Sequence, residues 1–251
     1  MPMIRPLLSA AGLCLSLSLP AQALDLETLS EGERALLRDE IRAYILDNPE
    51  IIMEAVAVLE QRQSQEQAQA DVDLVKVNAK ALFNDPASWV GGNPEGDITL
   101  VEFMDYRCSY CRRAFDEVAG LLENDGNIRF VVKEFPILGE DSVLASRFAI
   151  ATLQVAGDEA YKSVHDALMT YSGAMNETGF SRLADTLGLD ANKIISEMNT
   201  PAVDKVIADN HALGRRLAIS GTPSFVMGDQ MLRGYLPQDA MQEIADEIRA
   251  N

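Results

Sequence analysis

The stretch Ile98-Thr-Leu-Val-Glu-Phe-Met-Asp-Tyr-Arg-Cys-Ser-Tyr-Cys111 decides the fold. Residues 98–104 form an almost continuous apolar run of strand length, which is typical of a strand buried on both faces. Residues 108–122 then repeat their apolar positions at helical spacing, so we predict a helix that begins at the cysteines. A second apolar run over residues 128–135 ends at Pro136. This order predicts a β-α-β unit with parallel strands and a right-handed crossover.

Downstream of Pro136, the sequence predicts several helices and one β-hairpin. Residues 140–218 carry several helical apolar stripes and little strand signal. Residues 223–227 and 231–233 flank a Gly-Asp turn and predict a β-hairpin, and a final helix is expected over residues 237–248. The order of these elements around one buried sheet predicts an α/β or α+β domain.

The first 23 residues have the pattern of a secretory signal peptide. Arg5 is their only charge, residues 7–19 are apolar or small, and Ala21-Gln-Ala23 matches a cleavage site. The apolar run is too short to span a bilayer. We therefore expect cleavage after Ala23 and export, with an uncleaved anchor as the alternative. Cleavage would remove Cys14.

Residues 24–84 predict an N-terminal helical extension. Ser30 and Glu33 have the spacing of a capping box, and Asn48-Pro49 suits the start of a second helix. Residues 24–66 carry apolar stripes too small to form a core, so we expect them to self-associate, with packing onto the main domain as the alternative. Residues 67–84 are predicted to be a helical linker, and residues 85–251 the main domain.

Composition and charge limit the classes of partner. The 251 residues are 47% hydrophobic and 24% charged, which is ordinary for a globular protein. Lys and Arg total 21 against 39 Asp and Glu, a formal net charge of −18. A chain this acidic is repelled by phosphate backbones, so we expect no nucleic acid as a partner.

Two cysteines remain after export, Cys108 and Cys111, and they carry the predicted chemistry. A helix N-terminus stabilises the reactive thiolate, and a second thiol one turn along can attack a mixed disulfide. A purely structural disulfide is an alternative, but so small a loop adds little stability. A metal site would need further ligands, and His165 and His211 are the only histidines. We assign neither histidine a role. The cysteine spacing therefore predicts dithiol–disulfide exchange in an oxidising compartment.

Five further residues are candidates for the same site. Glu102 lies within the apolar strand, where burial predicts a raised pKa or a role in proton transfer; the alternative is that the strand turns it to solvent. Thr222-Pro223 opens the hairpin at the kind of junction where cis bonds occur, leaving backbone of Thr222 to pair with an extended peptide. Tyr106 and Tyr110 flank the cysteines and are expected to line the substrate surface.

Three motifs together resemble one family. Residues 100–111, Lys133-Glu-Phe-Pro136 and Gly221-Thr-Pro-Ser-Phe225 are similar to the DsbA-type branch of the thioredoxin superfamily. Within it, the N-terminal helices and the C-x-Y-C and Thr-Pro pairings resemble the ScsC-like proteins, periplasmic thiol–disulfide oxidoreductases associated with copper tolerance. The resemblance covers residues 85–251 and, more loosely, 28–84. It implies an α/β, thioredoxin-like fold: a central mixed sheet with flanking helices, a helical insertion at about residues 140–205 and an N-terminal helical extension.

The resemblance also implies roles for individual residues. Cys108 would be the exposed nucleophile, Cys111 the buried resolving cysteine and Glu102 the buried acid beneath the pair. Thr222 and Pro223 would form the cis-proline loop that faces the disulfide and binds substrate. In DsbA-like oxidases the two residues between the cysteines are Pro-His, whereas here they are Ser-Tyr. We therefore expect weaker thiolate stabilisation and a less oxidising couple.

These expectations favour a periplasmic disulfide isomerase or reductase. Its partners would be exported proteins with cysteines, a membrane thiol reductant and further copies of the chain, held through the N-terminal helices to raise effective concentration. We expect no cofactor. One alternative is a DsbA-like oxidase that a membrane oxidant regenerates. Another is a Cu(I)-binding copper-tolerance protein with Cys108 and Cys111 as soft ligands.

Overall fold

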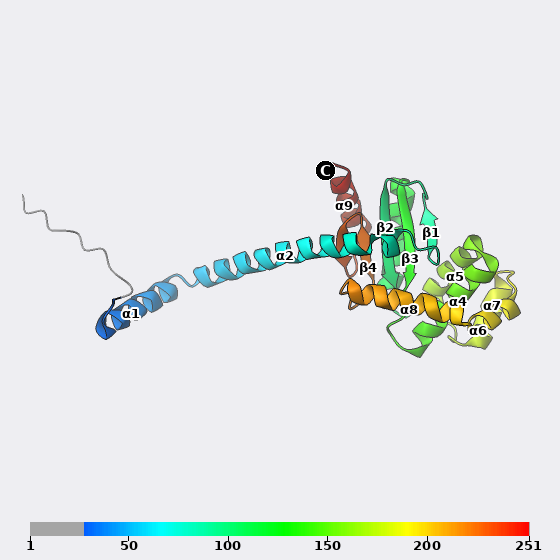
Figure 1. The fold of residues 1–251 in the computed structure, drawn as a ribbon, viewed down its shortest axis with the longest axis horizontal. Helices are drawn as coiled ribbons and strands as arrows, with labels where there is room; N and C mark the ends of the chain where they lie inside the picture. The colour runs from blue at the N-terminus through cyan, green and yellow to red at the C-terminus, as the bar shows by residue number, and fades with distance from the viewer. Residues whose placement is uncertain (1–27, 251) are drawn as a thin grey trace, which may run out of the picture. The chain divides into compact units, whose positions relative to one another are not determined.

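The computed structural model describes residues 28–250, so the predicted signal peptide lies outside the described residues. The chain divides into two units, one up to Glu60 and one from Gln61 onward. The first unit contains α1 (Glu31–Asp47) and the start of α2 (Glu50–Phe83) (Figure 1). The predicted capping box begins α1: the Ser30 hydroxyl accepts from the backbone N–H of Glu33, whose carboxylate accepts from the Ser30 N–H. Within residues 28–250 no helix has the length and hydropathy needed to cross a bilayer.

The second unit is built on a mixed five-stranded sheet. Its strand order is β1-β3-β2-β4-β5, with β2 and β3 parallel and every other neighbouring pair antiparallel. Helix α3 (Ser109–Asp125) connects β2 to β3, as the apolar pattern predicts. The mixed sheet with helices confirms the α/β fold class. The strands are β1 (Trp89–Gly92), β2 (Ile98–Met104), β3 (Ile128–Glu134), β4 (Ser224–Met227) and β5 (Gln230–Arg233).

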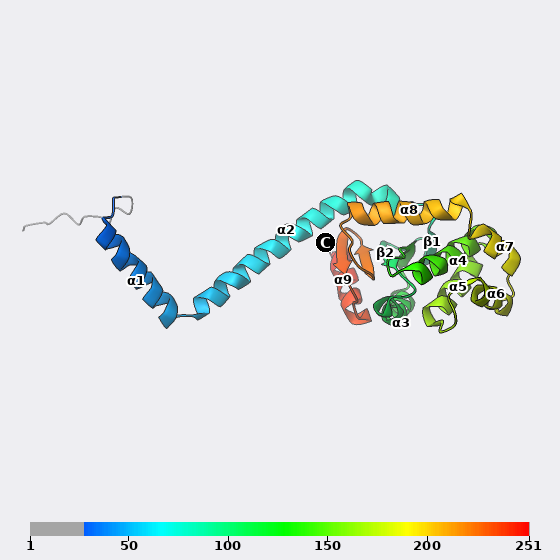
Figure 2. The ribbon, with the colours of Figure 1, turned by 90° about the horizontal axis from the view of Figure 1, so that it is seen from below.

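Helices cover both faces of this sheet. Helix α8 (Pro201–Arg216) and the end of α2 lie on one face, and α3 and α9 (Gln238–Ala250) lie on the other (Figure 2). A helical insertion separates β3 from β4 along the chain. It contains α4 (Glu140–Ala156), α5 (Asp158–Thr170), α6 (Glu177–Thr186) and α7 (Ala191–Glu197), and leads into α8.

Strand β2 lies between two hydrophobic clusters. Leu100 and Met104 belong to the larger cluster, and Val101 and Phe103 belong to the smaller one. Alternate side chains of a strand point to opposite faces, so both faces of β2 are buried. This is the arrangement that the continuous apolar run predicts.

Strand β1 is absent from the sequence prediction, because the glycine-rich segment at Gly91 and Gly92 is typical of a turn. Both residues pair antiparallel with β3 at the edge of the sheet. The indole of Trp89 explains why residue 91 is a glycine, because a Cβ at this position would lie 2.1 Å from an atom of the indole ring. Glycine in a strand marks such a close approach, and an edge strand tolerates it.

The end of α2 packs against the sheet. Val75 and Leu82 are buried in the smaller cluster, at 2% and 0% exposure. Asp71 forms an ion pair with Arg233 of β5, with one N–O distance of 2.9 Å. The compact unit therefore extends upstream of residue 85, because the last apolar stripe of α2 is part of its core.

We predict that Leu82→Ala lowers the free energy of unfolding by about 2–4 kcal/mol, because it removes buried methyl groups and leaves a cavity. Val77→Ala on the same helix is the matched control, since Val77 is 85% exposed. Urea unfolding followed by circular dichroism measures both. Equal stability of the two variants would contradict the packing of this part of α2.

Candidate active site

The two cysteines lie where β2 leads into α3. Cys108 is the N-cap residue of α3, and Cys111 lies in the first turn. The loop before them is fixed by Asp105, whose carbonyl accepts from the Cys108 N–H at 3.0 Å. The Asp105 carboxylate accepts from the N–H groups of Arg107 at 2.7 Å and Ile137 at 2.8 Å. This clamp presents the first thiol at a helix N-terminus, where a negative charge is favoured.

Both cysteines carry free thiols, and they differ in accessibility. Cys108 is 7% exposed and Cys111 is 0% exposed. The Cys108 thiol donates to the carbonyl of Thr222 at 3.1 Å, and the Thr222–Pro223 peptide bond is cis. Cys108 is the more accessible thiol, but it is less exposed than the resemblance implies because the loop at Thr222 lies against it.

Cys111 needs a base before it can react. Burial raises the pKa of the Cys111 thiol well above its ordinary value, and the neighbouring charge of Glu102 raises it further. The thiolate is the nucleophilic form of cysteine. An attack by Cys111 therefore depends on a group that takes its proton.

Glu102 is placed to be that group. The structure buries it at 3% exposure in the middle of β2, between Val132 of β3 and Phe225 of β4, rather than turning it to solvent. Burial raises the pKa of Glu102 to about 8, and the charge of Glu134 contributes to the shift. A carboxyl with a pKa near the working pH can both accept and return a proton.

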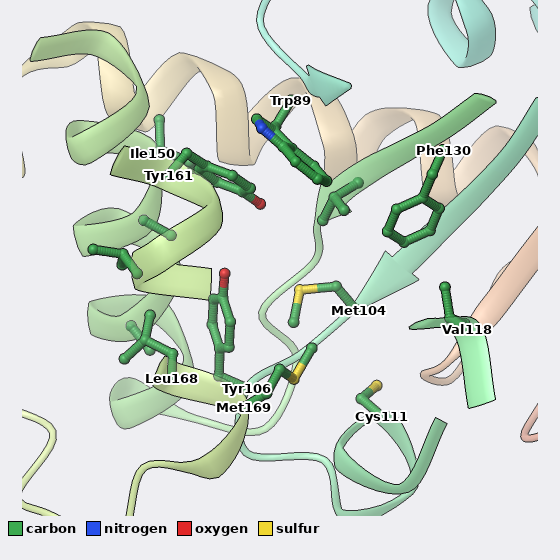
Figure 3. Close-up of a cluster of buried hydrophobic side chains, with 14 of the residues drawn as sticks. Trp89, Met104, Tyr106, Cys111, Val118, Phe130, Ile150, Tyr161, Leu168 and Met169 are labelled. Atoms are coloured by element: carbon green, nitrogen blue, oxygen red, sulfur yellow. The ribbon is translucent and has the colours of Figure 1, made fainter. Parts of the chain in front are cut away.

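A second buried acid, Glu134 at the end of β3, is missing from the sequence prediction. One of its carboxylate oxygens accepts from the Tyr106 hydroxyl at 2.8 Å and the Tyr161 hydroxyl at 2.7 Å, and the other accepts from Ser146 at 2.7 Å. Figure 3 shows the side chains of Tyr106 and Tyr161 converging within the core. Burial raises the pKa of Glu134 to about 7, while the three hydroxyl groups oppose the shift. A carboxyl within an apolar run, the signal that identifies Glu102, also marks Glu134.

His165 belongs to the same group of side chains. Its Nδ1 atom lies 3.1 Å from the Tyr106 hydroxyl, and burial lowers the pKa of His165 to about 3. The imidazole is therefore neutral at physiological pH. It occupies a core position with a hydrogen-bond partner, and it does not lie between the cysteines as the histidine of a Pro-His pair would.

Three other side chains near the site are also placed by the structure. Tyr110 is 58% exposed between the two cysteines and can contact substrate, whereas Tyr106 is 0% exposed. The expectation that Tyr106 lines the substrate surface is therefore wrong, because its hydroxyl is held in the core.

Lys133 is fully buried, and its ammonium group donates to the carboxylate of Asp85 at 2.7 Å. Because it alternates with Glu134 along β3, it lies on the face of the sheet opposite Glu102.

The arrangement supports thiol–disulfide exchange in two steps. Cys108 can form a mixed disulfide with an incoming sulfur, and Cys111 can then attack Cys108 while its proton passes to Glu102. Within residues 28–250 no group of three or more His, Cys, Asp or Glu side chains is arranged to hold a metal ion.

We predict that Glu102→Gln changes the pH dependence of stability. The folded protein retains a proton on Glu102 that the unfolded chain releases above its ordinary pKa of 4.5, so stability falls as the pH rises from 4.5 to about 8. The variant should retain about 1–3 kcal/mol of the stability that wild type loses in this range. Urea unfolding at several pH values measures it, with the exposed Glu123→Gln as the control. Parallel curves for all three proteins would contradict the burial of an ionisable Glu102.

Comparison with known families agrees with this geometry. Residues 99–246 match the family model of the DSBA-like thioredoxin domain, and residues 33–66 match that of the copper resistance protein ScsC N-terminal domain. A Na+/H+ antiporter of Salinispora arenicola, NhaA 1, is 28% identical over 153 residues, covering 61% of this chain and 23% of the antiporter. The chain thus spans less than a quarter of the length of this curated relative.

Solved structures show the same likeness. A thioredoxin-like oxidoreductase from Silicibacter pomeroyi DSS-3 is 46% identical, covering 68% of this chain and 98% of that chain with a TM-score of 0.64. Proteus mirabilis ScsC in a transitional conformation is 27% identical, covering 87% of this chain and 98% of that chain with a TM-score of 0.64. These matches confirm the predicted thioredoxin-like fold. The chain therefore belongs to the DsbA-like thioredoxin-domain family and carries an ScsC-like N-terminal segment.

Proposed function

We propose that the protein is an exported thiol–disulfide oxidoreductase that isomerises or reduces disulfides of periplasmic proteins. The observation that carries this proposal is the position of the Cys108 thiol, at the start of α3 and 3.1 Å from the carbonyl of the cis-proline loop. A substrate sulfur that approaches Cys108 also meets this loop. The signal-peptide pattern of residues 1–23 supports export to the periplasm.

The proposed reaction begins with the thiolate of Cys108. It attacks a substrate disulfide, a mixed disulfide forms, and one substrate sulfur leaves as a thiolate. In isomerisation, a substrate thiolate attacks the mixed disulfide and releases Cys108 unchanged. In reduction, Cys111 attacks the Cys108 sulfur, two electrons pass to the substrate, and a Cys108–Cys111 disulfide forms. A membrane thiol reductant then returns two electrons to the pair.

The residues between the cysteines favour isomerisation over oxidation. Ser109 and Tyr110 are both exposed and supply no positive charge to the Cys108 sulfur. His165 is neutral and bonded to Tyr106 in the core. A strong oxidant of this family requires a stabilised reduced form. Because the residues between the cysteines place no positive charge beside the Cys108 thiolate in the described site, we infer that the Cys108–Cys111 pair is more reducing than that of a DsbA-like oxidase.

The N-terminal helices support a homo-oligomer. Within the described residues, α1 has no buried residue. Contiguous exposed apolar surface marks an interaction site, and the match to the ScsC N-terminal family covers the same segment. We infer that copies of the chain associate through residues 24–66, which would hold several Cys108 thiols around one substrate. Among residues 28–66, the large exposed apolar side chains are Leu36, Leu37, Ile41, Tyr44, Leu46, Ile52, Met53, Val56, Val58 and Leu59.

Scrambled ribonuclease in a glutathione buffer tests the proposed activity. The mature protein should restore ribonuclease activity, and Cys108→Ser should abolish the effect because the attacking thiol is lost. Cys111→Ser should accumulate mixed disulfides, visible on non-reducing gels, because the resolving thiol is lost. Recovery with Cys108→Ser would contradict the mechanism. Oxidation of reduced ribonuclease without isomerisation would favour the oxidase, and neither reaction would favour Cu(I) binding.

Deletion of residues 24–66 tests the oligomer. Light scattering should show that the mass falls to that of a folded monomer, and isomerisation should weaken because the effective concentration of thiols is lost. Ile41→Glu should also dissociate the oligomer by placing a charge on the apolar surface, whereas Glu40→Gln should leave it intact. If the full-length chain is already a monomer, or the deletion leaves the mass per particle multimeric, association through this segment is excluded.

A further inference from the structure

A cavity of about 80 Å³ lies beside Glu102. Residues of β1, β2, β3, α3 and α5 line it, and most of the lining is apolar. Among the residues that line the cavity, Glu102 is buried, whereas Gly92, Ala119 and Lys162 are exposed. The cavity therefore runs from the carboxyl beneath the cysteines to the surface between β1, α3 and α5.

Two carboxyl oxygens at this cavity need a polar neighbour. Among residues 28–250, three buried side-chain oxygens have no hydrogen-bond partner in the protein: Glu102 Oε1, Ser142 Oγ and Asp166 Oδ1. Glu102 and Asp166 both line this cavity. An unsatisfied buried polar atom is costly, and native structures satisfy nearly all of them with protein or ordered water. An apolar occupant would leave both oxygens unsatisfied, so the occupant has to be polar.

Water fits this cavity in size and in chemistry. A single water needs roughly 10–15 Å³ of such space and two to four polar partners. The cavity is several times larger, and it offers a carboxyl at its buried end. At its outer end the other oxygen of Asp166 forms an ion pair with Lys162, and these two side chains are 37% and 50% exposed. A short chain of waters can therefore bond Glu102 at one end and Asp166 at the other.

We infer that this cavity is a water-filled proton path that connects Glu102 to solvent at the Lys162–Asp166 pair. The inference rests on the proposed function and on the position of Glu102 at the active site as the base for Cys111. When Cys111 attacks the Cys108 sulfur, the Cys111 proton passes to Glu102, then along the water chain to Asp166, and finally to a buffer base. The same path returns a proton when the disulfide is reduced. Each turnover leaves Glu102 in its starting state.

The other sides of Glu102 offer no comparable route. Its strand neighbours are Val132 and Phe225, which are buried, and Cys111 above it is fully buried. Only α5 brings exposed charged side chains to the cavity. The titratable and charged groups that interact with Glu102 or line its cavity are Glu134 from β3, Cys111 from the start of α3, and Tyr161, Lys162, His165 and Asp166 from α5. Asp105 and Tyr106 act on Glu134, and Cys108 acts on Cys111.

The chain contains its own reporter for this path. Trp89 is its only tryptophan and lines the same cavity. The indole N–H donates to the carbonyl of Asp158 at 3.1 Å, which fixes the ring in place. Indole fluorescence responds to a nearby change of charge, so it should follow the ionisation of Glu102 in the reduced protein.

A laser-induced pH jump on the reduced full-length protein tests the inference. Ala119→Leu places a larger apolar side chain at the exposed end of the cavity, and Ala119→Ser is the matched control. After the jump, Trp89 fluorescence and the infrared carboxyl band of Glu102 should relax about tenfold or more slowly in the leucine variant, because the proton must wait for a local opening. The serine variant should relax as wild type does. Asp166→Asn should also slow the relaxation. Glu102→Gln identifies the signal by abolishing it.

Each outcome bears on one proposal. Equal relaxation in wild type and Ala119→Leu would overturn the proton path, even if the ribonuclease assay establishes exchange. Slow relaxation in Ala119→Leu, together with an inactive wild type in the ribonuclease assay, would keep the path and reject the proposed function. Saturable stabilisation of the wild type by xenon would show a dry apolar cavity and overturn the path.

Discussion

The burial of the Glu102 carboxyl without a cation is the constraint on which the site depends. Lys133 comes from the adjacent strand, but it points to the opposite face and bonds Asp85. Lys162 at the same cavity pairs with Asp166, and no positive charge among the described residues offsets the desolvation, so the pKa of Glu102 rises to about 8. The same dry environment raises the pKa of Cys111. Burial therefore makes Glu102 a stronger base beside a thiol that cannot react without one.

Glu134 makes the ionisation of Glu102 still less favourable, because the two carboxyl groups are buried in the same apolar core. They lie on the same face of adjacent parallel strands, two positions apart in register. Three hydroxyl groups support a negative charge on Glu134, and that charge makes ionisation of Glu102 less favourable. The two groups therefore titrate as a coupled pair. The free energy of unfolding therefore falls as the pH rises. Such a loss of stability is common where buried ionisable groups take part in catalysis.

The sequence predicts those parts of the molecule whose neighbours are dictated locally. The apolar run over residues 98–104 has to be buried on both faces, and a C-x-x-C pair at the following helix start places two thiols one turn apart. Strand β1 could not be predicted, because a segment with two glycines becomes a strand only by pairing with residues 129–132 of β3. The partners of Glu134 also come from distant segments. Tyr106, Ser146 and Tyr161 meet only once α4 and α5 pack on the sheet.

The packed end of α2 lies close in the structure to the loop that faces Cys108. Residues 61–70 of α2 are exposed, and Asp71 is the first buried residue, where it pairs with Arg233. The next residue, Gly234, donates its N–H to the carbonyl of Pro223 at 3.0 Å. The ion pair that holds the helix on the sheet is therefore one residue from the bond that supports the cis-proline loop. The part of α2 that packs on the sheet therefore supports the same strand end as the loop that faces Cys108, so the helix end and the active-site loop share one structural support.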